Sequence, residues 1–171
     1  MYIETQRLVL KPFSEADMDD LCKLLRDDII KKTYMLPDFE SDEHCLKLAR
    51  RLRDLSLDES RYVVGIYLDG KLIGFSNDVE NVDGAIEMGY VIDPAHHNCG
   101  YATEAMTGII SCLHGQGFRE VIAGAFECNP ASIRVMQKSG MTLVDKIDEI
   151  EYRGKVHRCV YYVAKNINFS E

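Results

Sequence analysis

The segment from Ala85 to Leu113 constrains the fold more than any other part of the chain. Ala85–Ile92 reads as an apolar strand, and Pro94 then breaks the chain. A clear helical stripe follows, with apolar side chains at Ala102, Ala105, Met106, Ile109, Ile110 and Leu113. A strand that passes through a loop into an amphipathic helix predicts a domain of the mixed α/β class.

The other segments predict strands and helices on both sides of this one. Helices are expected after Ser14, after Ser41 and over Ala131–Ser139. Further strands are expected at Ile3–Leu10, Tyr62–Leu68, Lys71–Phe75, Val121–Phe126, Met141–Tyr152 and Lys155–Val163, the last two as a hairpin across Arg153-Gly154. We therefore predict one domain over residues 1–171, with a twisted, mixed sheet of about seven strands and about four main helices.

The charge balance excludes some partners. The chain has 20 Lys and Arg against 28 Asp and Glu, a formal net charge of −8. This argues against holding nucleic acid or a membrane by bulk electrostatics, and it suits a cationic or amine-bearing partner. The absence of a basic leader and of any long apolar run predicts a cytoplasmic protein that is neither exported nor membrane-spanning. The six scattered cysteines fit a reduced compartment, and no metal site is expected.

The loop before the predicted helix is a candidate anion site. The helix begins near Gly100 and Tyr101, where backbone N–H groups without helical partners point outward. The segment from Tyr90 to Phe118 contains no Lys or Arg, so an anion there would be held by amide dipoles, with help from His96 or His97. An ordinary helix start with a glycine turn is the alternative.

The same loop resembles a known family. His97-Asn98-Cys99-Gly100-Tyr101-Ala102 followed by Thr103-Glu104-Ala105 is similar to motif A of the GNAT superfamily of acetyl-CoA-dependent N-acetyltransferases. Asn129-Pro130-Ala131-Ser132 with Lys138-Ser139-Gly140 resembles a later family motif. The opening from Glu4 to Phe13 is similar to that of the RimJ/RimL-like branch, which acetylates ribosomal-protein N-termini. The resemblance covers nearly the whole chain.

This resemblance implies a binding site for acetyl-CoA as co-substrate. The strands at Ala85–Ile92 and Val121–Phe126 are then parallel and splay apart, with pantetheine in the gap and the pyrophosphate on amides from Asn98 to Ala102. The implied cofactor-binding residues are Tyr90, Val91, Ile92, His97, Asn98, Cys99, Gly100, Tyr101, Ala102, Asn129, Ser132 and Lys138. His97 replaces the usual Gln or Arg, which main-chain binding tolerates. Cys99 is either a reactive thiol or a solvent-facing bystander.

Two residues are candidates for catalysis. Glu87 lies on the strand beside the expected cleft, after Asp78, Glu80 and Asp83, and it is either the base for the acceptor amine or a structural carboxylate. Ser132 is either the proton donor to the leaving thiolate or a cap of its helix, because Met136 stands where many family members have a tyrosine. The oxyanion is expected to bind a main-chain N–H near Val91.

The predicted function is N-acetyl transfer to a primary amine, in a ternary complex with direct transfer. The acceptor is a protein or peptide N-terminus or a small amine, and the enzyme is a monomer or a homodimer. The alternative is a non-catalytic sensor of acetyl-CoA or another acyl-CoA on the same fold. Loss of thioester absorbance in the presence of an amine distinguishes the two.

Overall fold

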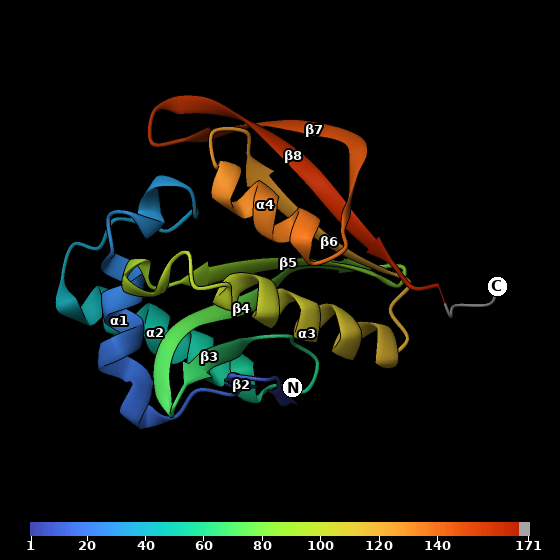
Figure 1. Ribbon diagram of the computed structural model, residues 1–171. Helices are drawn as coiled ribbons and strands as arrows, with labels where there is room; N and C mark the ends of the chain where they lie inside the picture. The colour runs from blue at the N-terminus through green and yellow to red at the C-terminus, as the bar shows by residue number, and fades with distance from the viewer. Residues whose placement is uncertain (168–171) are drawn as a thin grey trace. The chain divides into compact units, whose positions relative to one another are not determined.

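The computed structural model describes residues 1–167 (Figure 1). Its helices are α1 (Met18–Arg26), α2 (Asp42–Leu57), α3 (Tyr101–Gly115) and α4 (Pro130–Lys138), with 3-10 turns at Glu15–Asp17, Ile30–Lys32 and Pro94–His96. Its strands are β1 (Ile3–Glu4), β2 (Leu8–Lys11), β3 (Val64–Leu68), β4 (Lys71–Val82), β5 (Ala85–Ile92), β6 (Glu120–Phe126), β7 (Thr142–Tyr152) and β8 (Lys155–Lys165). The mixed α/β class and the four main helices are confirmed.

The described strands form a mixed sheet of eight, in the hydrogen-bonded order β1-β2-β3-β4-β5-β6-β8-β7. The predicted number, seven, was one too low because the expected strand Ile3–Leu10 folds back on itself. The Thr5 N–H donates to the Leu8 carbonyl (2.9 Å), and the Thr5 hydroxyl oxygen accepts from the Leu8 N–H (3.0 Å). This side-chain turn splits the segment into β1 and β2, which pair antiparallel with Ile3 opposite Leu10.

The chain divides into two compact units, the first of residues 1–77 and 90–105 and the second of residues 78–89 and 106 onward. Each is described by itself below, and the single domain expected from the sequence stays a prediction. No helix within residues 1–167 is long and apolar enough to cross a membrane.

In the first unit α1 and α2 pack side by side (Figure 1). The two predicted serine caps are present, Ser14 at the 3-10 turn Glu15–Asp17 that leads into α1 and Ser41 at the start of α2. Ser14 forms a capping box with Asp17, and the Ser41 hydroxyl oxygen accepts from the His44 N–H (3.1 Å). Their apolar faces meet the strands in one core, whose members include Leu21, Leu25, Cys45, Ala49, Tyr67, Phe75 and Val91. Burial of this core, which includes Val91, stabilises the end of β5 that leads into the loop.

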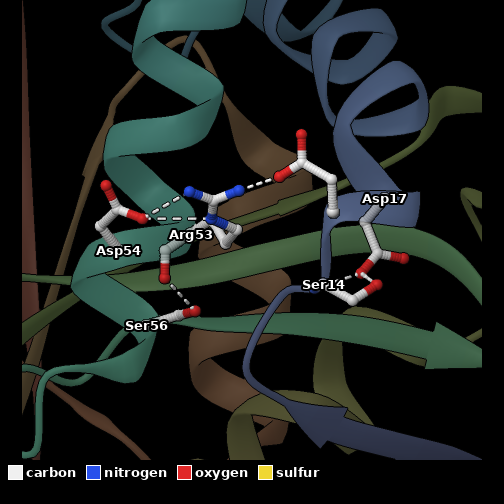
Figure 2. A network of polar contacts seen from close by, with 6 residues as sticks. Ser14, Asp17, Arg53, Asp54 and Ser56 are labelled. Carbon is white, nitrogen blue, oxygen red and sulfur yellow. Dashed lines mark hydrogen bonds and ion pairs between the residues drawn. The ribbon is translucent and has the colours of Figure 1, made fainter.

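A polar network joins the end of α2 to the turn before α1 (Figure 2). The Arg53 guanidinium donates to Asp54 (Nη2 to Oδ1, 2.8 Å) and to the Glu15 carboxylate. The buried Ser56 hydroxyl donates to the Arg53 carbonyl (2.6 Å) and accepts from the Phe13 N–H (3.0 Å). Ser56 thereby satisfies a main-chain donor that would otherwise be buried without a partner.

In the second unit β6 lies between a parallel and an antiparallel neighbour. It pairs with β5 over Glu120–Ile122 and with β8 over its full length. β7 and β8 form a long antiparallel hairpin through Arg153 and Gly154, both at positive φ, as the sequence predicted. β4 continues past Phe75 to Val82, longer than the sequence predicted, and turns at Asp83 and Gly84 (φ 51° and 78°) into β5.

Candidate active site

In the first unit, short polar contacts shape the loop that joins β5 to α3. The Asp93 carboxylate accepts from the Ala95 N–H (2.8 Å), and the Asp93 N–H donates to the Ile73 carbonyl of β4 (2.7 Å). Asn98 and Gly100 have positive φ angles of 61° and 83°, so the backbone is left-handed at two of three successive residues. The residues expected to hold a pyrophosphate, Asn98 to Ala102, therefore form one compact turn into the helix.

Gly100 is the N-cap of α3, because its carbonyl accepts from the Glu104 N–H (3.0 Å). The N–H groups of Tyr101 and Ala102 then have no acceptor within the helix. The helix dipole adds partial positive charge at this terminus. These features are compatible with the predicted anion site, and both that site and the roles of its residues in cofactor binding stay predictions.

The two histidines of the loop make different contacts, and their help in holding an anion stays a prediction. His97 Nε2 lies 2.8 Å from the Ile92 carbonyl and donates to it, so this ring ties the loop to the end of β5. His96 Nδ1 is buried without a hydrogen-bond partner among the described residues, 3.6 Å from Asp93 Oδ2. The Cys99 thiol is exposed and lies 3.4 Å from the His97 carbonyl, and its reactivity stays a prediction.

Sequence reasoning missed a cation at this turn, because it comes from the other end of the unit. Arg7 Nε donates to Glu104 Oε2 (2.7 Å), and Arg7 Nη1 donates to the Cys99 carbonyl (3.1 Å). The guanidinium carbon lies 4.5 Å from the centre of the Tyr101 ring. The matching signals were present separately, as Arg7 in the opening motif and Glu104 in motif A, but no local pattern links them.

Pairing between β5 and β6 is short. The parallel register contains Ala85, Ile86 and Glu87 opposite Glu120, Val121 and Ile122, and it stops there. This confirms that the two strands are parallel and paired over part of their length. Of the residues expected to line pantetheine, Val91 and Ile92 are buried and Tyr90 is half-buried. The Val91 carbonyl lies so close to Gly74 that a Cβ there would approach it to 2.2 Å, so only glycine fits beside this strand end.

In the second unit Glu87 is half-buried on β5. Burial raises the pKa of its carboxyl, the positive charge of Lys146 lowers it, and the negative charges of Glu80 and Asp148 raise it, with a net upward shift. A carboxylate with a raised pKa is a better proton acceptor than an exposed one. Of the acidic residues before it, Glu80 and Asp83 are exposed and Asp78 is buried.

The β7–β8 hairpin adds three side chains to this environment that sequence reasoning missed. Lys146 Nζ lies 4.1 Å from the centre of the Tyr161 ring and 3.7 Å from Asp148 Oδ2. Burial raises the pKa of Tyr161 far above its usual range, and the Asp148 carboxylate, which accepts from the Tyr161 hydroxyl, raises it further. Glu87 therefore shares one electrostatic environment with Asp148, Lys146 and Tyr161.

On α4 the capping role belongs to Asn129, whose side-chain oxygen accepts from the Ser132 N–H (3.2 Å). Ser132 is half-buried in the first turn of α4. Because Asn129 is the N-cap, the alternative that Ser132 caps the helix is wrong. Met136 is fully buried in the core, in accord with its inability to donate a proton. Arg134 and Lys138 are exposed. Proton donation by Ser132 and cofactor contacts by Asn129, Ser132 and Lys138 stay predictions.

The structure thus brings Tyr90, Val91, Ile92 and the turn from His97 to Ala102 together in the first unit. Glu87, Asn129, Ser132 and Lys138 belong to the second unit. No group of three or more His, Cys, Asp or Glu side chains within residues 1–167 has an arrangement that would hold a metal ion.

Comparison with known proteins identifies the family. A family model described as an acetyltransferase (GNAT) domain matches residues 7–142. The chain is 28% identical over 144 residues to the uncharacterized N-acetyltransferase YoaA of Bacillus subtilis, covering 81% of each protein.

Two solved structures share the fold. The GNAT-family acetyltransferase of Bacillus anthracis has a TM-score of 0.83 and 22% identity, over 97% of this chain and 99% of that one. RimL, named as a ribosomal alpha-N-protein acetyltransferase and solved with coenzyme A, has a TM-score of 0.85 and 18% identity, over 96% and 98%. At these identities the two neighbours show the shared fold alone. The chain belongs to the GNAT family of N-acetyltransferases.

Proposed function

We propose that this enzyme transfers the acetyl group of acetyl-CoA directly to the primary amine of a peptide N-terminus or of a small molecule. The observation that carries the proposal is Glu87, a half-buried carboxylate with a raised pKa on the strand that pairs with β6. Acetyl transfer needs a neutral amine, and a carboxylate with a raised pKa accepts the proton that an ammonium must lose.

The proposed reaction uses two groups of the second unit. The acceptor ammonium gives a proton to the Glu87 carboxylate, and its nitrogen lone pair attacks the thioester carbonyl carbon. The C–N bond forms, negative charge develops on the carbonyl oxygen near the Val91 N–H, and the C–S bond then breaks. The nitrogen loses its second proton to solvent as the adduct collapses, and the Ser132 hydroxyl protonates the leaving thiolate and recovers its proton from solvent. Glu87 releases the proton it accepted to solvent after turnover.

The proposed cofactor contacts of the first unit are mainly backbone contacts. The diphosphate of acetyl-CoA binds the amides of the Asn98–Ala102 turn, where the dipole of α3 favours negative charge. Pantetheine pairs with the Tyr90–Ile92 strand end. Main-chain donors do not depend on side-chain identity, so His97, Asn98 and Cys99 are compatible with this role although the family more often has other residues there.

The acceptor class follows from charge. Glu87 and Asp148 present carboxylates in one environment, and the whole chain has a net charge of −8. The contacts of Lys146 Nζ with Asp148 and with the Tyr161 ring support the proposal that this environment suits a primary ammonium. Peptide N-termini are the first class to test, since one structural neighbour is named as an acetyltransferase of a ribosomal protein N-terminus.

The test is Glu87→Gln, with thioester loss measured against pH. We expect kcat to fall most at low pH, where the amine is protonated and needs a base, and the deficit to shrink as rising pH supplies free amine. The control is Glu149→Gln, an exposed carboxylate on β7, which should retain the wild-type profile. An unchanged pH profile for Glu87→Gln would transfer the base role to water or to Glu127.

Ser132→Ala tests the second role. We expect a loss in kcat on the order of 10²-fold with acetyl-CoA affinity nearly unchanged, as for an interaction made at the transition state. Full kcat with weakened acetyl-CoA binding would make Ser132 a cofactor-binding residue only. Tight acetyl-CoA binding by the wild type without turnover of any amine would favour the acyl-CoA sensor.

A further inference from the structure

The N-terminal segment contributes charged contacts to the turn before α3, and no function described above requires them. The Glu104 side chain is only 15% exposed to solvent. Its carboxylate accepts three hydrogen bonds of 2.7 Å, from the Thr5 hydroxyl, the Arg7 N–H and Arg7 Nε. Burial raises the pKa of Glu104, but these hydrogen bonds and the Arg7 charge together lower it by more, so the net shift of the pKa is downward.

The Arg7 guanidinium occupies one fixed position against the turn. Nε is held by Glu104, Nη1 by the Cys99 carbonyl, and the planar group stacks over Tyr101. Nη2 lies 3.4 Å from the place where a Cβ on Gly100 would be. Arg7 therefore contacts the residues on both sides of Gly100, Cys99 and Tyr101.

These contacts restrict the turn to one of the conformations open to it. Asn98 and Gly100 both have positive φ angles, which a free loop samples only part of the time. A donor held on the Cys99 carbonyl between them restricts rotation of that peptide unit. The adjacent amides are then already oriented when an anion arrives, so less ordering entropy is lost on binding.

We propose that Arg7 is a positioning residue of the cofactor site: held by Glu104, its guanidinium fixes the turn at Cys99 and Gly100 on which the diphosphate binds. This inference rests on the proposed placement of the diphosphate. It makes the first strands of the chain part of the cofactor site, although they are remote from motif A in sequence.

An acetyl donor without the diphosphate distinguishes a positioning role of Arg7 in the cofactor site from a general role in folding. Arg7→Ala should raise KM for acetyl-CoA about tenfold, the factor equivalent to one charged hydrogen bond, and leave kcat nearly unchanged. S-acetyl-pantetheine, which has the thioester and no diphosphate, should be used equally well by wild type and variant. The matched control is Lys11→Ala on β2, which removes a cation 4.8 Å from the Tyr67 ring. It should leave the KM for both acetyl donors unchanged.

Arg7→Lys tests geometry against charge. Lysine keeps the positive charge but lacks the planar fork that joins Glu104, Cys99 and Tyr101, so it should restore little of the lost affinity. Full recovery by lysine would overturn the positioning role in favour of simple charge. An Arg7→Ala enzyme that loses activity equally with acetyl-CoA and with S-acetyl-pantetheine would overturn the positioning role in favour of a folding role.

A measurement without substrate keeps this inference separate from the proposed function. Hydrogen–deuterium exchange of a peptide covering residues 97–106 should be faster in Arg7→Ala than in wild type or Lys11→Ala. Equal exchange in all three proteins would overturn the inference whatever the activity. Faster exchange together with no acetyl-CoA turnover by the wild type would support the positioning role and refute the proposed function.

Discussion

Glu104→Gln removes the charge that holds the N-terminal segment to α3. Glutamine keeps one acceptor oxygen but turns an NH2 group toward the donors of Arg7, so at least one charge-assisted hydrogen bond is lost. A hydrogen bond to a charged group contributes about 1.5–3 kcal/mol, and the partial exposure of Arg7, 41%, favours a value near 2 kcal/mol. For a chain of this length about 1 kcal/mol corresponds to about 2–4 °C, so we expect Tm to fall by about 4–8 °C.

The assay is thermal unfolding followed by circular dichroism, from neutral to acid pH. Because the folded-state pKa of Glu104 is lowered, its contribution is present above the unfolded pKa and is lost as pH falls through the folded pKa. The difference between wild type and Glu104→Gln should therefore shrink in acid. The control is Glu4→Gln on β1, an exposed carboxylate that accepts from the Tyr2 hydroxyl and should change Tm little. A Glu104→Gln protein with wild-type Tm at neutral pH would refute the reasoning.

Four further changes test other parts of the account. Gly100→Val forces a β-branched residue to φ 83° and should abolish the rise in Tm that acetyl-CoA produces, while an unchanged rise would place the diphosphate elsewhere. Ser56→Ala leaves the Phe13 N–H without its partner and should lower the free energy of unfolding by about 1–3 kcal/mol in a denaturant titration, whereas no loss would show that water replaces the hydroxyl. Lys146→Met removes the charge that lowers the pKa of Glu87, so the acid limb of the rate profile should move to higher pH, and an unmoved limb would separate the two groups. Glu87→Gln should keep or raise Tm at neutral pH, because a raised pKa makes ionised Glu87 unfavourable above the folded pKa, and a large drop would indicate a structural carboxylate.

Elements with strong local signals were predicted closely from the sequence. The serine caps of the turn before α1 and of α2, the glycine turn before α3 and the Arg153-Gly154 hairpin depend on residues adjacent in the chain. The missed turn between β1 and β2 contains no Gly, Pro, Asn or Asp. It depends on the Thr5 side chain bonding to Leu8, which composition does not reveal.

The surroundings of the candidate catalytic residues could not be predicted in the same way. Glu87 itself was found from its position on a strand, but Lys146, Asp148 and Tyr161 depend on the register of β7 and β8. That register shifts between Leu143 and Ile147, so simple alternation does not give the face on which each side chain lies. Arg7 and Glu104 are 97 positions apart, beyond the reach of any local pattern.

The most direct test of the central claim is acetylation of a peptide N-terminus by the purified protein. Acetyl-CoA and a peptide with a free amino terminus are incubated with wild type and with Glu87→Gln, and thioester loss and peptide mass are followed at several pH values. We predict equal amounts of thioester lost and acetyl-peptide formed by the wild type, and a rate deficit for the variant that is greatest at low pH. Acetyl-CoA binding without acetyl transfer to the peptide or to any small amine would contradict the account.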